Sequence, residues 1–216
     1  MTRHRKHKQL LKELGSQNNM ILNGNYLREK ELIDKLSSKI NDKCSIENIN
    51  IAKINLPYPK IQVKSQNKKY AKILSTDFCG KVSEFTAISQ YINHELRLDN
   101  KYSNASKTLL SISKIEMIHM QIIGEIIILL GGSPNYCFYD YDSYNFWTPQ
   151  YVEYGTNYVN MILLDINSEY KAIKQYEDHI NAIDDNYIKA ILERIIKDEK
   201  YHIELLTELL DQDKTD

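Results

Sequence analysis

Hydrophobic residues recur every three or four positions from about residue 70 onward, and this spacing predicts a series of amphipathic helices. Polar turns and helix breakers divide the pattern into four long segments. Gly80 precedes the first segment, and the Gly131-Gly132-Ser133-Pro134 run ends the second. The expected helices span about residues 81–99, 104–130, 158–183 and 186–210.

Connections between these helices alternate between short and long. Ser103 or Asn104 is expected to cap the second helix, and Asp184-Asp185 to cap the fourth, each after a short turn. Residues 135–155 form a long crossover rich in Tyr, which we expect to pack over the side of the bundle. This order predicts an all-α, antiparallel four-helix bundle with a long crossover between its second and third helices.

Residues 1–70 follow a different pattern, and we expect them to form an N-terminal extension ahead of a bundle domain at residues 71–216. The first twelve residues are basic and are expected to be solvated. One helix is expected from Asn25 to Ile40. Pro57 and Pro59 favour extended structure between Ile49 and Lys64. The role of this extension does not follow from its sequence.

Acidic residues and histidines interrupt the apolar stripe of each predicted helix. An ionised glutamate buried alone costs several kcal/mol, so such a residue must be paired or must coordinate a cation. Two of the interruptions are Glu-x-x-His motifs, whose spacing places both side chains on one helical face. The interrupting residues are Glu84, Glu116, His119, Glu169, Glu199 and His202.

An internal repeat supports the same grouping. Residues 83–94 return as residues 168–179 with seven of twelve positions identical, and each copy begins with Ser-Glu. The two glutamates of the first hairpin each lie 16 residues from Asn100, and those of the second each lie 15 residues from Asp184. At 1.5 Å per residue, both pairs sit roughly 23 Å along their helices. The four carboxylates are therefore expected at one level of the bundle.

Four carboxylates and two imidazoles suit two Fe or two Mn ions per chain, because hard oxygen ligands combine with borderline nitrogen ligands. Two divalent ions would balance the four negative charges. The alternative is a bundle whose inner Glu and His side chains only hydrogen-bond one another. Tyr91 and Tyr176 follow their glutamates by seven residues, so they are either core aromatics or hydroxyl donors to ligand carboxylates. His94 and His179 are expected to be packing or surface residues.

Composition limits the classes of partner. The formal net charge of −1 argues against nucleic acid. No apolar run approaches the about 20 residues that a membrane-spanning helix requires. Three widely spaced cysteines without a Cys-x-x-Cys motif are typical of a reducing compartment, so a cytoplasmic protein is expected.

At these residues the chain resembles the ferritin-like superfamily, and within it the rubrerythrin-like and manganese catalase-like proteins of anaerobic bacteria. The similarity covers about residues 70–216 and implies a ferritin-like bundle. It implies that Glu84 and Glu169 are terminal ligands and that Glu116 and Glu199 bridge the two ions. It also implies that His119 and His202 complete the ligand set, one at each ion. In manganese catalases the position matching Glu199 is not a ligand, so its role stays open. Rubrerythrins carry a further Glu where this chain has Ala172, and a Cys-paired rubredoxin module that this sequence does not show.

The resemblance implies an oxidoreductase that removes hydrogen peroxide, of catalase or peroxidase type, in oxidative-stress defence. Its expected substrate is hydrogen peroxide or dioxygen, with an external electron donor in the peroxidase case, and a homo-oligomer is expected. Two alternatives stay open. One is a ferroxidase, iron-storage or metal-binding protein, and the other is a structural, coat-associated bundle without catalysis.

Overall fold

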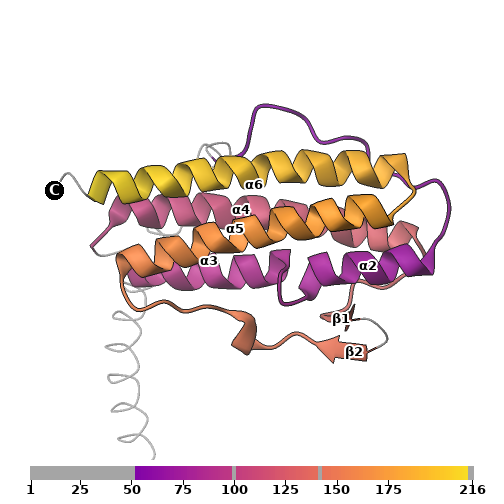
Figure 1. Cartoon of the computed structure of the whole chain (residues 1–216), viewed down its shortest axis with the longest axis horizontal. Coiled ribbons are helices and arrows are strands. Elements are labelled where there is room, and N and C mark those ends of the chain that lie inside the picture. The colour runs from indigo at the N-terminus through magenta and orange to yellow at the C-terminus, as the bar shows by residue number, and fades with distance from the viewer. Residues whose placement is uncertain (1–51, 99–100, 141–142, 214–216) are drawn as a thin grey trace, which may run out of the picture. The chain divides into compact units, whose positions relative to one another are not determined.

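A computed structural model describes residues 52–98, 101–140 and 143–213. Four long helices lie side by side: α3 (Glu84–Leu98), α4 (Ser103–Leu129), α5 (Tyr158–Ala182) and α6 (Asn186–Asp213) (Figure 1). Helix α3 packs along α4 and α5 along α6, and the two hairpins meet through α3–α5 and α4–α6. The predicted four-helix bundle is confirmed. Within the described residues, no helix is both long and apolar enough to cross a bilayer.

Helix ends follow local capping chemistry, with one correction. The hydroxyl of Ser83 accepts a hydrogen bond from the backbone N–H of Thr86 at 3.2 Å and begins α3. The carboxylate of Asp185 accepts from the N–H of Tyr187 at 3.0 Å at the start of α6, as predicted. The expected cap on α4 was wrong, because Ser103 is already helical and Tyr102 occupies the cap position without a side-chain hydrogen bond there.

A further helix, α2 (Lys68–Cys79), precedes the bundle in the described part of the chain and was not predicted as a separate element. Asn67 caps it by accepting hydrogen bonds from two backbone N–H groups, and Gly80 ends it. Its buried face packs on α4 and carries Ala71, Leu74 and Phe78. The proposed domain boundary at residue 70 falls inside this helix. The division into two domains stays a prediction.

The crossover between α4 and α5 contains a short antiparallel hairpin, which the helical periodicity did not indicate. Strand β1 (Cys137–Asp140) pairs with β2 (Ser143–Phe146), and a single 3₁₀ turn, η3 (Pro149–Tyr151), follows. Part of the crossover packs on the side of the bundle as predicted, whereas Tyr144 and Phe146 of β2 are 48% and 71% exposed. The ring of Trp147 lies 4.7 Å from that of Phe85, and its Nε1 donates a hydrogen bond to Thr86 Oγ1 at 3.0 Å.

The buried core consists of two apolar clusters with a charged layer between them. Along α4, Leu109 and Ile112 belong to one cluster, and Ile123 and Ile126 belong to the other. Glu116 and His119 lie between these two stretches of the same helix and are also buried. The layer is thus enclosed above and below by apolar side chains, which keeps water away and strengthens electrostatic interactions within it.

An irregular segment at residues 52–64, here called the strap, crosses the outside of α6, where Figure 1 shows it in indigo. The backbone N–H of Ile54 donates to Asp198 Oδ1 at 3.0 Å. Further along, the N–H of Lys64 donates to Asp185 Oδ2 at 2.7 Å. Residues 54–64 contain no helix or strand, which agrees with the extended structure predicted around the prolines. The helix expected at residues 25–40 lies outside the described residues.

Candidate metal centre

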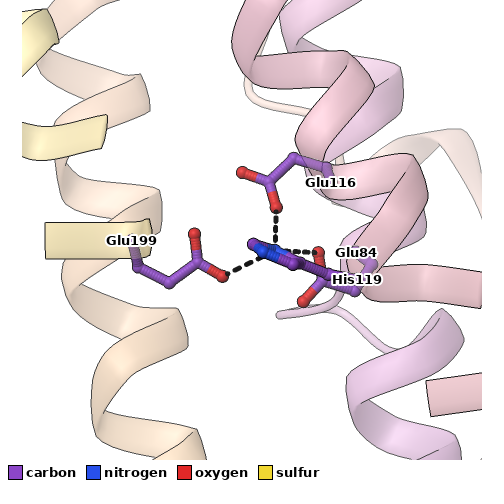
Figure 2. Close-up of side chains that lie close together, drawn as sticks. All are labelled: Glu84, Glu116, His119 and Glu199. Atoms are coloured by element: carbon purple, nitrogen blue, oxygen red, sulfur yellow. Dashed lines mark hydrogen bonds and ion pairs between the residues drawn. The ribbon is translucent and has the colours of Figure 1, made fainter. Parts of the chain in front are cut away.

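Two groups of buried side chains, each able to hold a metal ion, share Glu116 and Glu199. Within each group, one nitrogen or oxygen atom per residue lies within 4.8 Å of every other. No member exposes more than 3% of its surface. Figure 2 shows the group built on His119. The structure thus brings together all six residues singled out by the sequence: Glu84, Glu116, His119 and Glu199 in one group, and Glu116, Glu169, Glu199 and His202 in the other.

The Nδ1 atom of His119 faces three carboxylates from three helices. It lies 3.0 Å from Glu116 Oε2, 3.2 Å from Glu199 Oε1 and 3.7 Å from Glu84 Oε2 (Figure 2). On the other side of the ring, Nε2 lies 3.2 Å from Asp198 Oδ2. A neutral imidazole that donates its Nε2 hydrogen to Asp198 presents the Nδ1 lone pair to the cluster, as a metal ligand must.

Asp198 is an ionised acceptor for that hydrogen. Burial alone would raise its pKa, but hydrogen bonds from His119 and Tyr58, together with Arg194, outweigh burial and lower the pKa to about 2. Its Oδ1 forms an ion pair of 2.8 Å with Arg194 Nη1. Sequence reasoning missed Asp198, although it immediately precedes Glu199, because only residues on the inner stripe were considered.

His202 is arranged in the same way around the second group. Its Nε2 lies 2.8 Å from the backbone carbonyl oxygen of Ala52, which can only accept, so Nε2 carries the hydrogen. Its Nδ1 lies 2.9 Å from Glu199 Oε2 and 3.0 Å from Glu116 Oε1. Among the described residues, these three buried atoms have no hydrogen-bond partner in acceptable geometry. Lone pairs that converge without a hydrogen bond suit a cation at their centre.

The pKa shifts of the clustered side chains also favour a cation at this position. Burial, followed by repulsion from Glu116, raises the pKa of both Glu84 and Glu169 well above the usual range. Burial also acts to raise the pKa of Glu116, but His202 and His119 outweigh it and hold that pKa well below the usual value. The pKa of each histidine is raised by the surrounding carboxylates against the effect of burial. Protons and metal ions therefore compete for the same buried atoms.

Tyr91 and Tyr176 each contact the carboxyl group of the opposite repeat. The hydroxyl of Tyr91 donates a hydrogen bond to Glu169 Oε1, and that of Tyr176 donates to Glu84 Oε1. Burial, and then the charge of Glu169, raises the pKa of Tyr91 well above its usual range. A hydroxyl that keeps its proton acts as a donor, and here it fixes the orientation of a candidate ligand.

The two histidines of the repeat do not lie loosely at the surface. His94 is fully buried, and its Nδ1 lies 2.9 Å from Asp165. The Nδ1 of His179 lies 2.7 Å from Asp77 Oδ2. His94 is packed inside the bundle, which is one of the two expected outcomes, and each histidine in addition pairs with a buried aspartate. No sequence signal linked Asp77 to His179, since Asp77 lies outside the repeat.

A small cavity reaches the cluster between α3 and α5. Its volume is about 10 Å³, comparable to the space needed by a single water molecule. All four glutamates of the cluster line it, whereas neither histidine does. Small side chains of the two repeats, Ala87 and Ala172, complete the wall together with Ser83 and Ser168. Because both alanines are partly exposed, the cavity extends from the carboxylates toward the surface of the bundle.

Known proteins share this architecture. A probable manganese catalase of Clostridium acetobutylicum is 28% identical over 176 residues, which cover 73% of this chain and 77% of that protein. A bacterioferritin of Streptomyces coelicolor is 29% identical over 133 residues, which cover 60% of this chain and 74% of that protein. Among solved structures, a manganese catalase from Anabaena superposes with a TM-score of 0.66 at 21% identity, covering 74% of this chain and 78% of that one.

The family of ferritin-like domains, Ferritin, matches residues 82–215, more than half of the chain. The match contains all four bundle helices and every member of the buried cluster. The resemblance expected from the duplicated glutamates and Glu-x-x-His motifs is confirmed. The chain belongs to the ferritin-like domain family.

Proposed function

We propose that the buried cluster binds two metal ions, Mn or Fe, and that the protein uses them to remove hydrogen peroxide. The observation that carries this proposal is the convergence of unpartnered, buried lone pairs from Glu116, Glu199 and His202 on one point. Because Glu116 and Glu199 belong to both groups, they are assigned as bridging ligands. Glu84 with His119, and Glu169 with His202, are assigned to one ion each.

A bound metal pair supplies two-electron redox chemistry. In disproportionation, one peroxide molecule gives up two electrons and two protons to become dioxygen. A second peroxide takes up two of each and becomes two molecules of water. The carboxylates that line the cavity are the available proton acceptors, while Tyr91 and Tyr176 hold Glu169 and Glu84 in place.

The cavity and the comparisons favour peroxide as the substrate. A cavity of about 10 Å³ between α3 and α5 leads to the carboxylates, and a space this small suits a substrate of few atoms such as peroxide. The sequence relative with the greater coverage of this chain, 73%, is described as a probable manganese catalase. Disproportionation also needs no electron donor other than peroxide itself.

Iron oxidation and storage is the second candidate, and the match to a bacterioferritin is the observation that favours it. A ferroxidase would use the same cluster but would take iron as substrate and pass it on. The two proposals differ in assembly, because storage requires a large closed shell, whereas a peroxide-removing enzyme can work as a small homo-oligomer.

The test is to load the purified protein with Mn²⁺ or Fe²⁺, measure the ions bound per chain, and follow peroxide consumption together with oxygen release. One dioxygen released per two peroxides consumed would support disproportionation. Peroxide consumption that requires an added reductant would support a peroxidase. Uptake of many iron atoms per chain by a large shell would favour storage. Protein that holds two ions and turns over no peroxide with either metal would contradict the proposal.

A further inference from the structure

We propose that the strap, residues 52–64, is a working part of the metal centre, because it supplies or fixes the outer hydrogen-bond partner of both histidines. The inference rests on the proposed metal binding. It assigns a role to a segment that lies outside the region matched by the ferritin-like family, which begins at residue 82. The strap contacts the histidine side of the cluster, and the cavity opens on the carboxylate side.

The strap is anchored on α6 by two buried side chains one helical turn apart. Arg194 donates from Nε to the carbonyl oxygen of Leu56 at 2.9 Å, and from Nη2 to the same oxygen at 2.7 Å. Asp198 accepts from the backbone N–H of Ile54 at 3.0 Å. Arg194 and Asp198 are only 2% and 0% exposed, so the strap seals both charges from solvent. A buried ion pair with further hydrogen bonds fixes the position of its members.

Tyr58 connects this anchor to His119. Its hydroxyl donates to Asp198 Oδ2 at 2.6 Å and lies 3.1 Å from His119 Nε2. Its ring lies against the Arg194 guanidinium at 4.4 Å and meets the His119 ring edge-on at 5.9 Å. Asp198 is thereby held from three sides, by Ile54, Tyr58 and Arg194. Its Oδ2 remains directed at Nε2 of His119, which keeps Nδ1 directed at the cluster.

The second histidine contacts the strap directly. The carbonyl oxygen of Ala52, a fully buried residue, lies 2.8 Å from His202 Nε2. One histidine is therefore oriented by a strap carbonyl, and the other by an aspartate that the strap holds. Outer partners of this kind set the tautomer and raise the basicity of a ligating imidazole, and their loss weakens metal binding by about 10- to 100-fold. Tyr58 is assigned as a positioning residue.

Replacing Tyr58 by Phe tests this role, because the change removes the hydroxyl and keeps the ring. Tyr70→Phe is the matched control, since the hydroxyl of Tyr70 accepts a hydrogen bond from the N–H of Asp184, in the turn between α5 and α6. Each full-length variant and the wild type would be titrated with Mn²⁺ and with Co²⁺ against a competing chelator. The Co²⁺ absorption spectrum reports the geometry of each ion.

We expect Tyr58→Phe to lower the affinity for one of the two ions by about tenfold and to change the Co²⁺ spectrum. The affinity for the other ion should stay the same. Tyr70→Phe should match the wild type for both ions. A strap that merely covers the bundle would lower the melting temperature of Tyr58→Phe and leave its affinities for both ions unaltered, which would overturn the inference. A wild type that binds neither metal would overturn the proposed function and this inference with it.

A second measurement needs no variant. If the strap strengthens metal binding, bound metal must stabilise the docked strap by the same free energy, because such coupling is reciprocal. Hydrogen exchange at the N–H of Ile54, which bonds to Asp198, should slow when Mn²⁺ is added to the wild type. Exchange at the N–H of Lys64, which bonds to Asp185 at the other end, should change much less. Equal rates at Ile54 with and without bound metal would contradict the proposed role.

Discussion

The hydroxyl of Tyr176 on α5 donates a hydrogen bond to the carboxyl group of Glu84 on α3, a residue 92 positions earlier in the chain. Tyr91 on α3 donates the equivalent hydrogen bond to Glu169 on α5. The internal repeat thus pairs crosswise, each copy holding the glutamate of the other. A symmetric exchange of this kind keeps the two halves of the bundle, and the carboxyl groups between them, in one register.

Replacing Tyr176 by Phe should therefore disturb one side of the centre. The change removes a buried hydrogen bond, and we expect the free energy of unfolding to fall by about 1 kcal/mol. Affinity for one of two ions should fall by roughly tenfold. Urea denaturation followed by helical circular dichroism and chelator competition would measure the two effects. Tyr170→Phe is the control, since Tyr170 is 59% exposed. Equal metal affinities in the two variants would contradict the assigned role of Tyr176.

Replacing a bridging glutamate should release more metal ions than replacing a terminal glutamate. Glu116 belongs to both groups, so Glu116→Ala should abolish binding of both ions. Glu84 belongs to one group, so Glu84→Gln should remove one ion and retain the other. Metal analysis after desalting would count the ions. Loss of the same number of ions in both variants would refute the assignment of Glu116 as a bridge.

Metal should also stabilise the fold through the same residues. A ligand at 100 times its dissociation constant adds about 2.7 kcal/mol to the free energy of unfolding. The wild type should therefore melt at a higher temperature with Mn²⁺ than with a chelator. Glu116→Ala should melt at the same temperature under the two conditions. Without metal, Glu116→Ala should be less stable than the wild type, because it removes the buried carboxylate that pairs with His119 and His202 at 3.0 Å and leaves both histidines without that partner.

The cavity wall offers a test that separates access from metal binding. Ala172 lines the cavity and is not part of either group of candidate ligands. Ala172→Leu should fill a space of about 10 Å³, reducing peroxide turnover at least tenfold while two ions remain bound. Oxygen release and metal content, measured on the same sample, would show this. Lys174→Leu, at a position whose side chain is 68% exposed, is the control for added apolar bulk on α5.

The sequence was sufficient for the six clustered residues because helices are periodic. A side chain three or four positions along an apolar stripe shares its face, and equal distances from a turn imply equal depth, so Glu84 and Glu116 could be matched without a structure. Asp198 escaped this reasoning because it lies about 100° around the helix from Glu199. Its partners come from the strap, where no regular period relates Tyr58 to His119.

Loop and sheet elements were missed for a related reason. The crossover was expected to pack on the bundle because of its aromatic residues, but its strand pairing depends on the register of Cys137 with Phe146, which no periodic pattern marked. Helix α2 carries apolar residues at helical spacing. It was overlooked because the first helix was expected to begin after Gly80, so the helical pattern from residue 70 to residue 79 was not assigned to an element of its own.

The ion pair between His179 and Asp77 makes part of the stability depend on pH. Burial acts to lower the pKa of His179, but Asp77, at 2.7 Å, outweighs it and raises the pKa above its usual value of 6.5. The native state therefore holds this proton more tightly than the unfolded chain does. The stabilisation is fully present below about pH 6.5 and is lost as the pH rises through the raised native pKa.

His179→Gln should remove this contribution, so the difference in the free energy of unfolding between wild type and variant should shrink as the pH rises. Urea denaturation between about pH 5.5 and 9 would measure it at each pH. Taking the difference cancels the titration of the other histidines, which both proteins share. The gap between the two proteins should be largest at the acidic end. A gap that stays constant over this range would show that the charge on His179 does not hold α5 to Asp77 of α2.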